Sequence, residues 1–473
     1  MICCGHCLGV FAVVLPANVF FACHEYLVKP CDHGRLLIST KTIVDIMNDH
    51  TEISQQPSLK QAFWVWLHIG VLSFGGPAAQ IALIHREVVE KRQWLPESQY
   101  LNALNFCMLL PGPEAMQLAS YVGWRLHGVL GGLMAGLLFV LPGAFVILTL
   151  AAIFIIFGQV PLIDAVFQGV QATVVVIVVS ALLRVAQKSL QHTTHWLIAT
   201  VAFVAIFFFA IPYPLVVIGA GIIGAYALQQ KIESSITPRS QSLQQTIKTI
   251  VVWLLIWWLP VLCVMLFSGQ PILSDIAVFF SKLAVVTFGG AYAVLAYMAQ
   301  DVVGIKNWLT THEMMTGLGL AETTPGPLIL VTEFVGFLGA YREGGWWLGL
   351  AGAALTLWVT FVPCFLWIFV GGPYIEWISA RPQLRGALSA ITAAVVGVIL
   401  SLSLWFALHV FFHIVEEKNI YAMTLWQPAF SSIQWPVILL TLVNGYVLLF
   451  RRWNIMAVLV VSSALMVLFN LVY

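Results

Sequence analysis

The amino-acid sequence predicts an all-α polytopic membrane protein that consists of two homologous multi-span halves with proline- and glycine-broken helices. Hydrophobic residues make up 60% of the 473 residues and charged residues only 9%, whereas soluble globular domains carry about 25% charged residues. The mean hydropathy is +0.95, and most apolar stretches approach the ~20 residues with which a helix crosses a bilayer. Several motifs also recur at a constant spacing. We therefore expect a multi-pass protein of the cell membrane, surrounded by lipid.

Composition argues against several other classes of protein. A net charge of +1 lacks the basic excess of a nucleic-acid-binding protein, so no nucleic-acid partner is expected. Five of the eight cysteines lie within the first 31 residues and the others stand alone in apolar runs, which does not fit a disulfide scaffold. No nucleophile and base, and no metal cluster, fall at one membrane depth. We accordingly expect no enzyme, no catalytic residue, no metal and no cofactor.

The amino-terminal segment differs from the rest of the chain. Residues 8–22 form a short apolar run, but no Lys or Arg precedes it as a signal peptide requires. Cys4 and Cys7 have the C-x-x-C spacing of a redox or metal pair, but no second pair follows at zinc-ligand spacing. We interpret residues 1–57 as a lead, with Met47 as the working start.

A polar stretch divides the apolar spans into two sets. Residues 229–248 include Lys231, Glu233, Pro238 and Arg239, and their basic side chains place this linker in the cytoplasm by the positive-inside rule. The sequence therefore predicts a first repeat over 58–229, the linker with one connecting span over 230–272, and a second repeat over 273–473. Basic residues in the second half are split between two sides, which favours an inverted second repeat, although the number of spans alone leaves the orientation open.

Matched motifs reveal the internal repeat. Three motifs recur at one and the same spacing, namely Phe74-Gly75-Gly76 as Phe288-Gly289-Gly290, Trp94-Leu95 as Trp308-Leu309, and Pro111-Gly112-Pro113 as Pro325-Gly326-Pro327. After the loss of one position, Gly131, Gly132 and Gly136 match Gly344, Gly345 and Gly349. Several independent matches indicate a duplicated membrane unit, the construction that many transporters use.

The repeated motifs break helices inside the membrane. Broken helix is tolerated in lipid only where protein or a water-filled cavity satisfies the freed backbone groups. Each new helix start presents free N–H groups and about half a positive charge, and glycine lets a ligand approach the backbone. The breaks therefore predict a site for a small oxyanion. A kink that serves packing alone is the alternative, but two matched breaks favour a function.

Residues at the breaks are the candidate substrate ligands. They are Gly75, Gly76, Pro111, Gly112, Pro113, Gly289, Gly290, Pro325, Gly326 and Pro327. Arg86 is the strongest side-chain candidate, because a guanidinium group can hold two oxygens at once.

Four acids are candidates for coupling. Glu114 follows the first Pro-Gly-Pro directly, and Glu322 precedes the second by three residues. Either could carry a coupling proton if burial favours its protonated form, or could instead cap a helix. Glu87 and Asp301 occupy matching positions beside basic residues. Each could act in a gate or form a solvated ion pair, and the sequence leaves both roles as alternatives.

Together these motifs carry a family resemblance. In the first half they are Ser73-Phe-Gly-Gly-Pro77, Gln80, Glu87, Trp94-Leu95, Leu110-Pro-Gly-Pro113, Gln117 and Tyr121-x-Gly123, and in the second Thr287-Phe-Gly-Gly290, Trp308-Leu309 and Thr324-Pro-Gly-Pro327. Over roughly residues 58–472 the sequence resembles the chromate ion transporter family in its long, two-domain form.

The resemblance implies a function and adds site residues. It implies proton-motive-force-linked export of chromate, chromate resistance, opposed halves, and sulfate as a competitor of similar shape and charge. It adds Pro77, Gln80 and Gln117 to the candidate substrate ligands. In the second half Ala291 stands in place of Pro77 and Leu328 in place of Glu114, so the two halves would have unequal roles. Transport of sulfate or another oxyanion, in either direction, is the alternative, and monomer and homodimer both remain open.

Overall fold

The computed structural model describes residues 57–158, 160–228, 243–288, 291–375, 381–420 and 423–472. Three sequence predictions fall outside these ranges. They are the amino-terminal lead up to residue 56, including Cys4, Cys7 and Met47, most of the linker (residues 229–242), and the pair Gly289 and Gly290.

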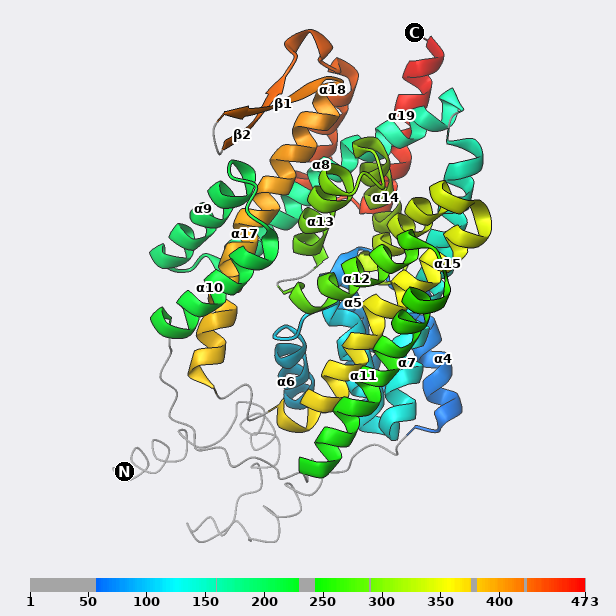
Figure 1. Cartoon of the computed structure of the whole chain (residues 1–473), viewed down its shortest axis with the longest axis vertical. Coiled ribbons are helices and arrows are strands. Elements are labelled where there is room, and N and C mark those ends of the chain that lie inside the picture. Colours follow the sequence, from blue (N-terminus) through cyan, green and yellow to red (C-terminus); the bar gives the residue numbers. More distant parts are fainter. Residues whose placement is uncertain are drawn as a thin grey trace, which may run out of the picture. The chain divides into compact units, whose positions relative to one another are not determined.

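The described residues are helical apart from one antiparallel hairpin. In the first half the helices are α4 (Leu59–Leu72), α5 (Gly76–His85), η1 (Arg86–Glu90), α6 (Glu97–Cys107), α7 (Glu114–Phe157), α8 (Pro161–Ser189), α9 (Thr193–Phe207) and α10 (Tyr213–Ala227). The connecting helix is α11 (Leu243–Phe267). The second half contains α12 (Pro271–Val286), α13 (Ala291–Ala299), η2 (Gln300–Ile305), α14 (Thr311–Thr323), η3 (Leu328–Leu330), α15 (Val331–Gly371), η4 (Gly372–Tyr374), α17 (Pro382–Phe411), β1 (Val415–Ile420), β2 (Met423–Pro428), η5 (Phe430–Ser432), α18 (Trp435–Gly445), η6 (Tyr446–Phe450) and α19 (Ile455–Val472) (Figure 1).

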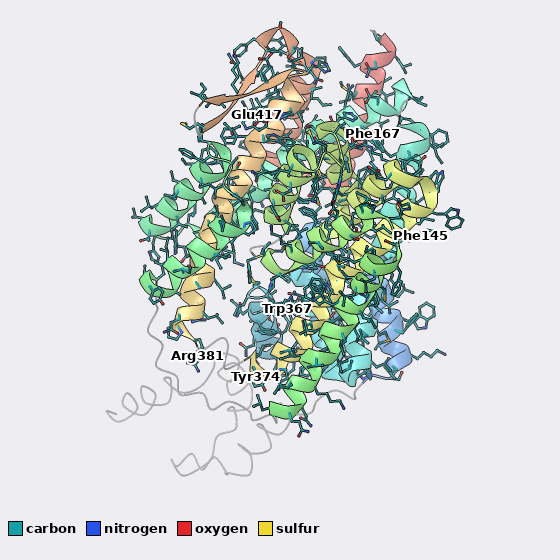
Figure 2. The ribbon with its side chains drawn as sticks, in the orientation of Figure 1. Phe145, Phe167, Trp367, Tyr374, Arg381 and Glu417 are labelled. Atoms are coloured by element: carbon teal, nitrogen blue, oxygen red, sulfur yellow. The ribbon has the colours of Figure 1, made fainter. Side chains whose placement is uncertain are left out.

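The predicted membrane architecture is confirmed. In the described part, six helices are long and apolar enough to cross a membrane. Many large apolar side chains on them are exposed, such as Phe145 at 73%, which points outward in Figure 2. A soluble protein rarely exposes so much contiguous apolar surface, whereas lipid covers it at no cost. Figure 2 also shows Arg381 and Glu417 near the two ends of α17, whose 30 residues span about 45 Å.

Two of the long helices are hairpins. In α7 the backbone leaves the helical conformation at His127 and Gly128, and in α15 at Gly344 and Gly345. A Cβ atom built on Gly123 would lie 2.3 Å from the carbonyl oxygen of Gly131, although eight residues of straight helix are about 12 Å long. Each helix therefore folds back on itself as two antiparallel arms in close contact.

The second hairpin is longer than the first. The first hairpin turns at Gly128 and the second at Gly345, so these two glycines are structurally equivalent. The sequence match had instead paired Gly345 with Gly132. Gly131 packs against Gly123 within the first hairpin, whereas Gly344 belongs to the second turn. The glycine matches beyond the turn were therefore wrong in register, because the arms of the second hairpin are extended by about one helical turn.

The two halves have opposite orientations. The turn of α7 lies beside the start of α4, where His127 Nε2 hydrogen-bonds the Pro57 carbonyl oxygen at 2.7 Å. From this turn the second arm of α7, residues 128–157, runs about 45 Å to the start of α8. There Asp164 pairs with His312 of α14 at 3.3 Å. Because Arg342, beside the second turn, bonds Glu313 of α14, the two hairpin turns lie at opposite ends. Figure 1 shows α6 and α14 separated in the same way. The inverted orientation favoured by the basic residues is confirmed.

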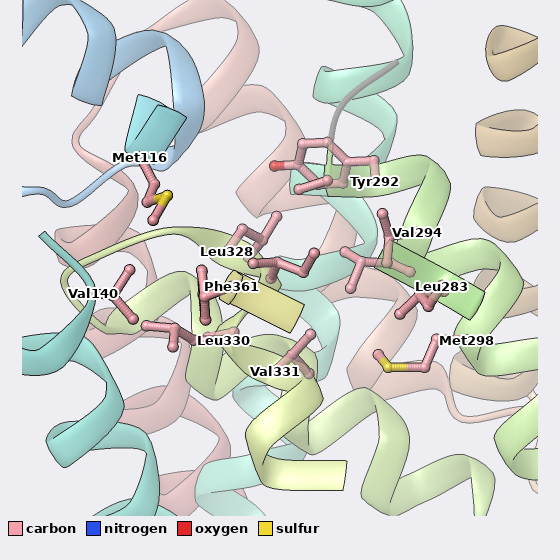
Figure 3. Close-up of a cluster of buried hydrophobic side chains, with 14 of the residues drawn as sticks. Met116, Val140, Leu283, Tyr292, Val294, Met298, Leu328, Leu330, Val331 and Phe361 are labelled. Carbon is pink, nitrogen blue, oxygen red and sulfur yellow. The ribbon is translucent and has the colours of Figure 1, made fainter. Parts of the chain in front are cut away.

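The halves share one hydrophobic core. Figure 3 shows Met116 and Val140 of α7 beside Leu328, Leu330 and Val331 of the second half. The second arm of each hairpin also packs against the Pro-Gly-Pro segment of the other half: Gly143 lies against Pro325, and Cys364 against Gly112. Because lipid is as apolar as these side chains, van der Waals packing and not burial from water holds the halves together.

Corresponding π-helical segments carry the matched acids. The segments η1 and η2 follow α5 and α13. π-Helical turns are rare in proteins, and those that occur often lie at functional sites. Glu87 of η1 is only 1% exposed and accepts hydrogen bonds from Lys91, at 2.7 Å, and Arg92. Burial opposes its ionisation, but the bonds and charges of Lys91 and Arg92 outweigh burial and lower the pKa of Glu87. The carboxylate of this ion pair is therefore buried, while the side chains of Lys91 and Arg92 are 55% and 32% exposed.

The buried ion pair predicts a pH-dependent loss of stability. Glu87→Gln should destabilise the protein by about 2 kcal/mol at neutral pH, since it removes charged hydrogen bonds from a buried acceptor. A lowered pKa in the folded state means that Glu87 stabilises the protein above the pKa of an unfolded glutamate, and that this stabilisation disappears as the pH falls through the lowered value. Thermal unfolding in detergent, with the exposed Glu90→Gln as control, measures the difference. If the difference in unfolding temperature between Glu87→Gln and the wild type became larger at acid pH, Glu87 would not be the ionised partner of Lys91 and Arg92.

Packing across the halves predicts a steric requirement at Gly143. A methyl group there would lie 2.0 Å from the carbonyl oxygen of Pro325, a backbone atom that cannot rotate away. Gly143→Ala should lower the unfolding temperature in detergent. Gly219→Ala on α10 is the matched control, because nothing lies within 4 Å of the added atom and Ala favours helix over Gly. Equal unfolding temperatures for the two variants would show that the contact is not restrictive.

Candidate functional site

Four chain breaks meet where the halves face each other. In each half a glycine break, at Ser73–Gly75 or from Thr287 onward, precedes a proline break, at residues 111–113 or 325–327. The Gly112 N–H donates to the Thr287 carbonyl oxygen at 2.9 Å, and the Gly326 N–H donates to the Ser73 carbonyl oxygen at 2.9 Å. Each proline break is therefore hydrogen-bonded to the glycine break of the opposite half.

Residue types at the breaks follow from these bonds. Gly112 and Gly326 have φ values of +117° and +92°, which side chains with a Cβ atom rarely adopt. The Ser73 hydroxyl donates to the Ile69 carbonyl oxygen at 2.5 Å, and the Thr287 hydroxyl donates to that of Leu283. These hydroxyls satisfy carbonyl groups that the ends of α4 and α12 leave free. Ser or Thr before Phe-Gly-Gly thus has a structural reason.

Two buried glutamines complete the network. Gln80 Nε2 donates to the carbonyl oxygens of Gly326, at 2.6 Å, and Ser73, at 3.2 Å. Gln117 Nε2 donates to the Pro111 carbonyl oxygen at 2.7 Å, while its Oε1 is buried without a hydrogen-bond partner. Both predicted ligands thus use their amide N–H groups to hold the breaks in place in this conformation, and the free Oε1 of Gln117 is an acceptor that cannot donate to an oxyanion.

A small cavity lies between the breaks. It is lined by Pro77, Gln80, Pro113, Glu114, Ala115, Ala291, Pro327, Leu328 and Ile329. Its volume of about 20 Å³ is close to the space that one water molecule requires. A tetrahedral oxyanion does not fit, so this conformation shows the site contracted.

Helix starts surround the cavity. The helices α5, α7 and η3 begin here without a hydrogen bond from a capping side chain. Their first N–H groups are therefore available to a ligand, and the helix dipoles add positive potential. Such an arrangement binds anions. The sequence prediction that the breaks bring helix starts together agrees with this geometry, while the binding roles of the individual residues remain predictions.

Two cations of α8 act on the acids beside the cavity. Lys188 attracts Glu114 of the cavity wall. Arg184, one helical turn earlier, attracts Glu322, which also accepts a hydrogen bond from Tyr292 at 2.9 Å. Both cations are exposed. Sequence reasoning used them only for membrane orientation, although two cations four residues apart on an apolar helix are a detectable signal.

The remaining candidates lie away from the cavity. Arg86 is 54% exposed, approaches Glu87 at 3.8 Å and does not line the cavity. Glu87 is held by its own cations, and Asp301 occupies the matching place in η2. Roles for these three residues in binding or coupling remain predictions that the contracted conformation does not support.

Sequence reasoning also missed a buried acid. Glu333, in the first arm of α15, is 1% exposed, and its Oε2 has no hydrogen-bond partner. The available signal was an acid in an apolar helix shortly after the second Pro-Gly-Pro. Within the described ranges, no three His, Cys, Asp or Glu side chains gather as a metal site requires.

Comparison with known proteins agrees with this architecture. The family model described as chromate transporter matches residues 60–225 and 274–468. A probable chromate transport protein of Synechococcus elongatus is 30% identical over 72% of this chain and 83% of the relative. The chromate transport protein of Cupriavidus metallidurans is 28% identical over 72% of this chain and 81% of its own.

More distant relatives include an uncharacterized transporter of Methanocaldococcus jannaschii, which is 24% identical over 85% of this chain and 97% of its own. No solved structure matches the chain. The family model covers both halves separately, on either side of the connecting helix α11, as an internal repeat requires. The chain belongs to the chromate transporter family and is a multi-pass membrane transporter.

Proposed function

We propose that this protein is a secondary transporter that exports chromate across the cell membrane in a process linked to the proton motive force. The observation that carries the proposal is the set of uncapped helix starts around one cavity between inverted halves. Two relatives, most of whose length is matched by this chain, are named as chromate transport proteins.

Backbone donors suit a doubly charged tetrahedral anion. Several N–H groups from different helices can each meet one oxygen, while partial dipole charges attract the ion without holding it irreversibly. A full positive charge at the cavity wall would bind more tightly and release more slowly. The residues that line the cavity include no Lys or Arg and one acid, Glu114.

The cations of α8 favour loading from one side. Arg184 and Lys188 lie in the last turns of α8, which begins at Pro161. When α17 is aligned with α8 from its own first residue, Pro382, the equivalent positions hold Trp405 and His409, whose ring centroids lie 4.4 Å apart with the rings tilted by 38°. Among the described residues, the pair of cations on α8 therefore has no counterpart at the equivalent positions of α17. The positive-inside rule assigns the Arg184 end to the cytoplasm, which fits export.

Movement of the breaks would open the contracted site. Alternating access in inverted-repeat transporters moves one repeat against the other around a fixed central site. Here the crossed hydrogen bonds at Gly112 and Gly326 join the halves at that centre, so they are the contacts that an opening movement would exchange.

Uptake into inverted membrane vesicles tests the proposed function. Vesicles that contain the protein should accumulate radiolabelled chromate faster when their interior is acidic, a protonophore should abolish the increase, and excess sulfate should compete. Vesicles without the protein are the control. Uptake no faster than in the control vesicles would refute chromate transport, and uptake indifferent to the gradient would refute the proton linkage alone.

Healing the proline breaks should abolish transport but not insertion. In Pro111→Ala/Pro113→Ala the helix can continue and the free N–H groups of the α7 start are lost. The same pair at Pro325 and Pro327 should impair transport less, because the lining is unequal in the two halves. Protein in the membrane fraction and chromate uptake are measured together. Normal uptake with both breaks healed would contradict the anion-site model.

Neutralising the α8 cations should weaken substrate capture. Arg184→Gln/Lys188→Gln should raise the KM for chromate several-fold at low salt and less at high salt, because steering by exposed charges is screened. Lys248→Gln on α11 removes an exposed cation elsewhere and is the matched control. Equal KM values for both variants would remove α8 from the entrance.

A further inference from the structure

Glu333 differs from the other buried acids of the described residues. Three acids are buried there: Glu87, Glu322 and Glu333. Glu87 has Lys91 and Arg92, and Glu322 has the Tyr292 hydroxyl and the attraction of Arg184. Glu333 forms no ion pair, and its Oε2 accepts no hydrogen bond.

Charged groups on neighbouring elements do not compensate it. The elements packed against α15 include α7, α11, α12 and α14. Their titratable or charged side chains are Glu114, Tyr121, Arg125, His127, Lys248, Cys263, Asp275, Lys282, His312, Glu313 and Glu322. The segment η4, which also packs against α15, adds Tyr374, and α15 itself has Tyr341, Arg342, Glu343 and Cys364. None of these side chains forms an ion pair with Glu333 among the described residues.

An unpaired carboxylate at this depth would be expensive. An ionised group without a partner in an apolar interior loses its hydration and gains nothing in return. Glu333 therefore holds a proton in this conformation and releases it only when a movement brings water or a cation to it. A site with those two states is what coupling to a proton gradient requires.

Glu333 also occupies a place that can sense such a movement. It lies one turn before Gly336, where a Cβ atom would come within 2.0 Å of Thr356 Oγ1 on the second arm. The start of the same helical segment, Leu328 and Ile329, lines the cavity. A movement of Leu328 and Ile329 that opened the cavity would therefore involve the helical segment that carries Glu333.

The first half lacks this acid. Glu333 directly precedes Phe334, and the residue that directly precedes the matching Tyr121 is Ser120, whose Oγ faces Gly136 in the first hairpin. A hydroxyl there has no proton to exchange at physiological pH, so the position that matches Glu333 in the first half cannot carry a coupled proton.

We propose that Glu333 carries the proton coupled to anion transport: it is protonated while the cavity is contracted and deprotonated when α15 moves and the site opens. This inference rests on the proposed function. It replaces Glu114 and Glu322, the two acids that the sequence favoured, which have cations near them and fit the entrance better.

Two assays on purified full-length protein in liposomes test the role of Glu333. One measures chromate uptake driven by a proton gradient, and the other measures exchange of radiolabelled for unlabelled chromate without a gradient. Glu333→Gln should keep exchange and lose the stimulation by the gradient. Glu333→Asp should keep stimulation with a shifted pH profile. Ser120→Ala, in the matching place of the first half, should retain both activities.

Each outcome decides the proposal. Unchanged stimulation and pH profile in Glu333→Gln would overturn it, as would loss of exchange in both variants of a correctly folded protein, which would indicate a structural role. If Glu333→Gln does not fold, an unshifted pH profile of Glu333→Asp overturns it. Absence of exchange in the wild type would refute chromate transport itself, and exchange without any stimulation would refute the proton linkage, so the failures are distinguishable.

Discussion

Two crossed hydrogen bonds, from Gly112 to Thr287 and from Gly326 to Ser73, are the contacts on which the centre of this protein depends. A helix broken inside a membrane leaves N–H and C=O groups that lipid cannot satisfy. Each half breaks its helices twice and supplies the partner that the other half lacks. Each half therefore depends on the other to satisfy these backbone groups in lipid.

Equivalent backbones carry unequal side chains. The breaks, hairpins and π-helical segments recur in both halves, whereas the chemistry does not: Tyr292 and Glu322 stand where the first half has Ala78 and Met108. A structure with exact two-fold symmetry would present the same site to both sides of the membrane. In this protein the side chains make the two halves different, so the surroundings of the cavity differ between its two sides.

Sequence reasoning reached the membrane fold, the repeat and the position of the breaks, because composition and motif spacing are local properties. It did not find the register of the hairpins. The arms of the second hairpin are each longer by about one helical turn, and the sequence does not show where the turn between the arms lies. It ranked Arg86 highly from its guanidinium chemistry, but the direction of α5 carries that residue away from the cavity. Glu333 was missed because burial and the lack of a partner are properties of packing, and the β1–β2 hairpin was missed because its segment contains charged residues between apolar spans.

The cavity wall and Glu333 belong to one helical segment. Leu328 and Ile329 line the cavity, and the same segment continues into α15, where Oε2 of Glu333 has no hydrogen-bond partner. In the proposed mechanism an anion binds the helix starts, and Glu333 loses its proton when water reaches it. In the proposed mechanism, free energy from a proton gradient acts on the same opening movement that admits the anion. The proposed coupling then requires no direct contact between the proton and the anion, only that both respond to the position of α15.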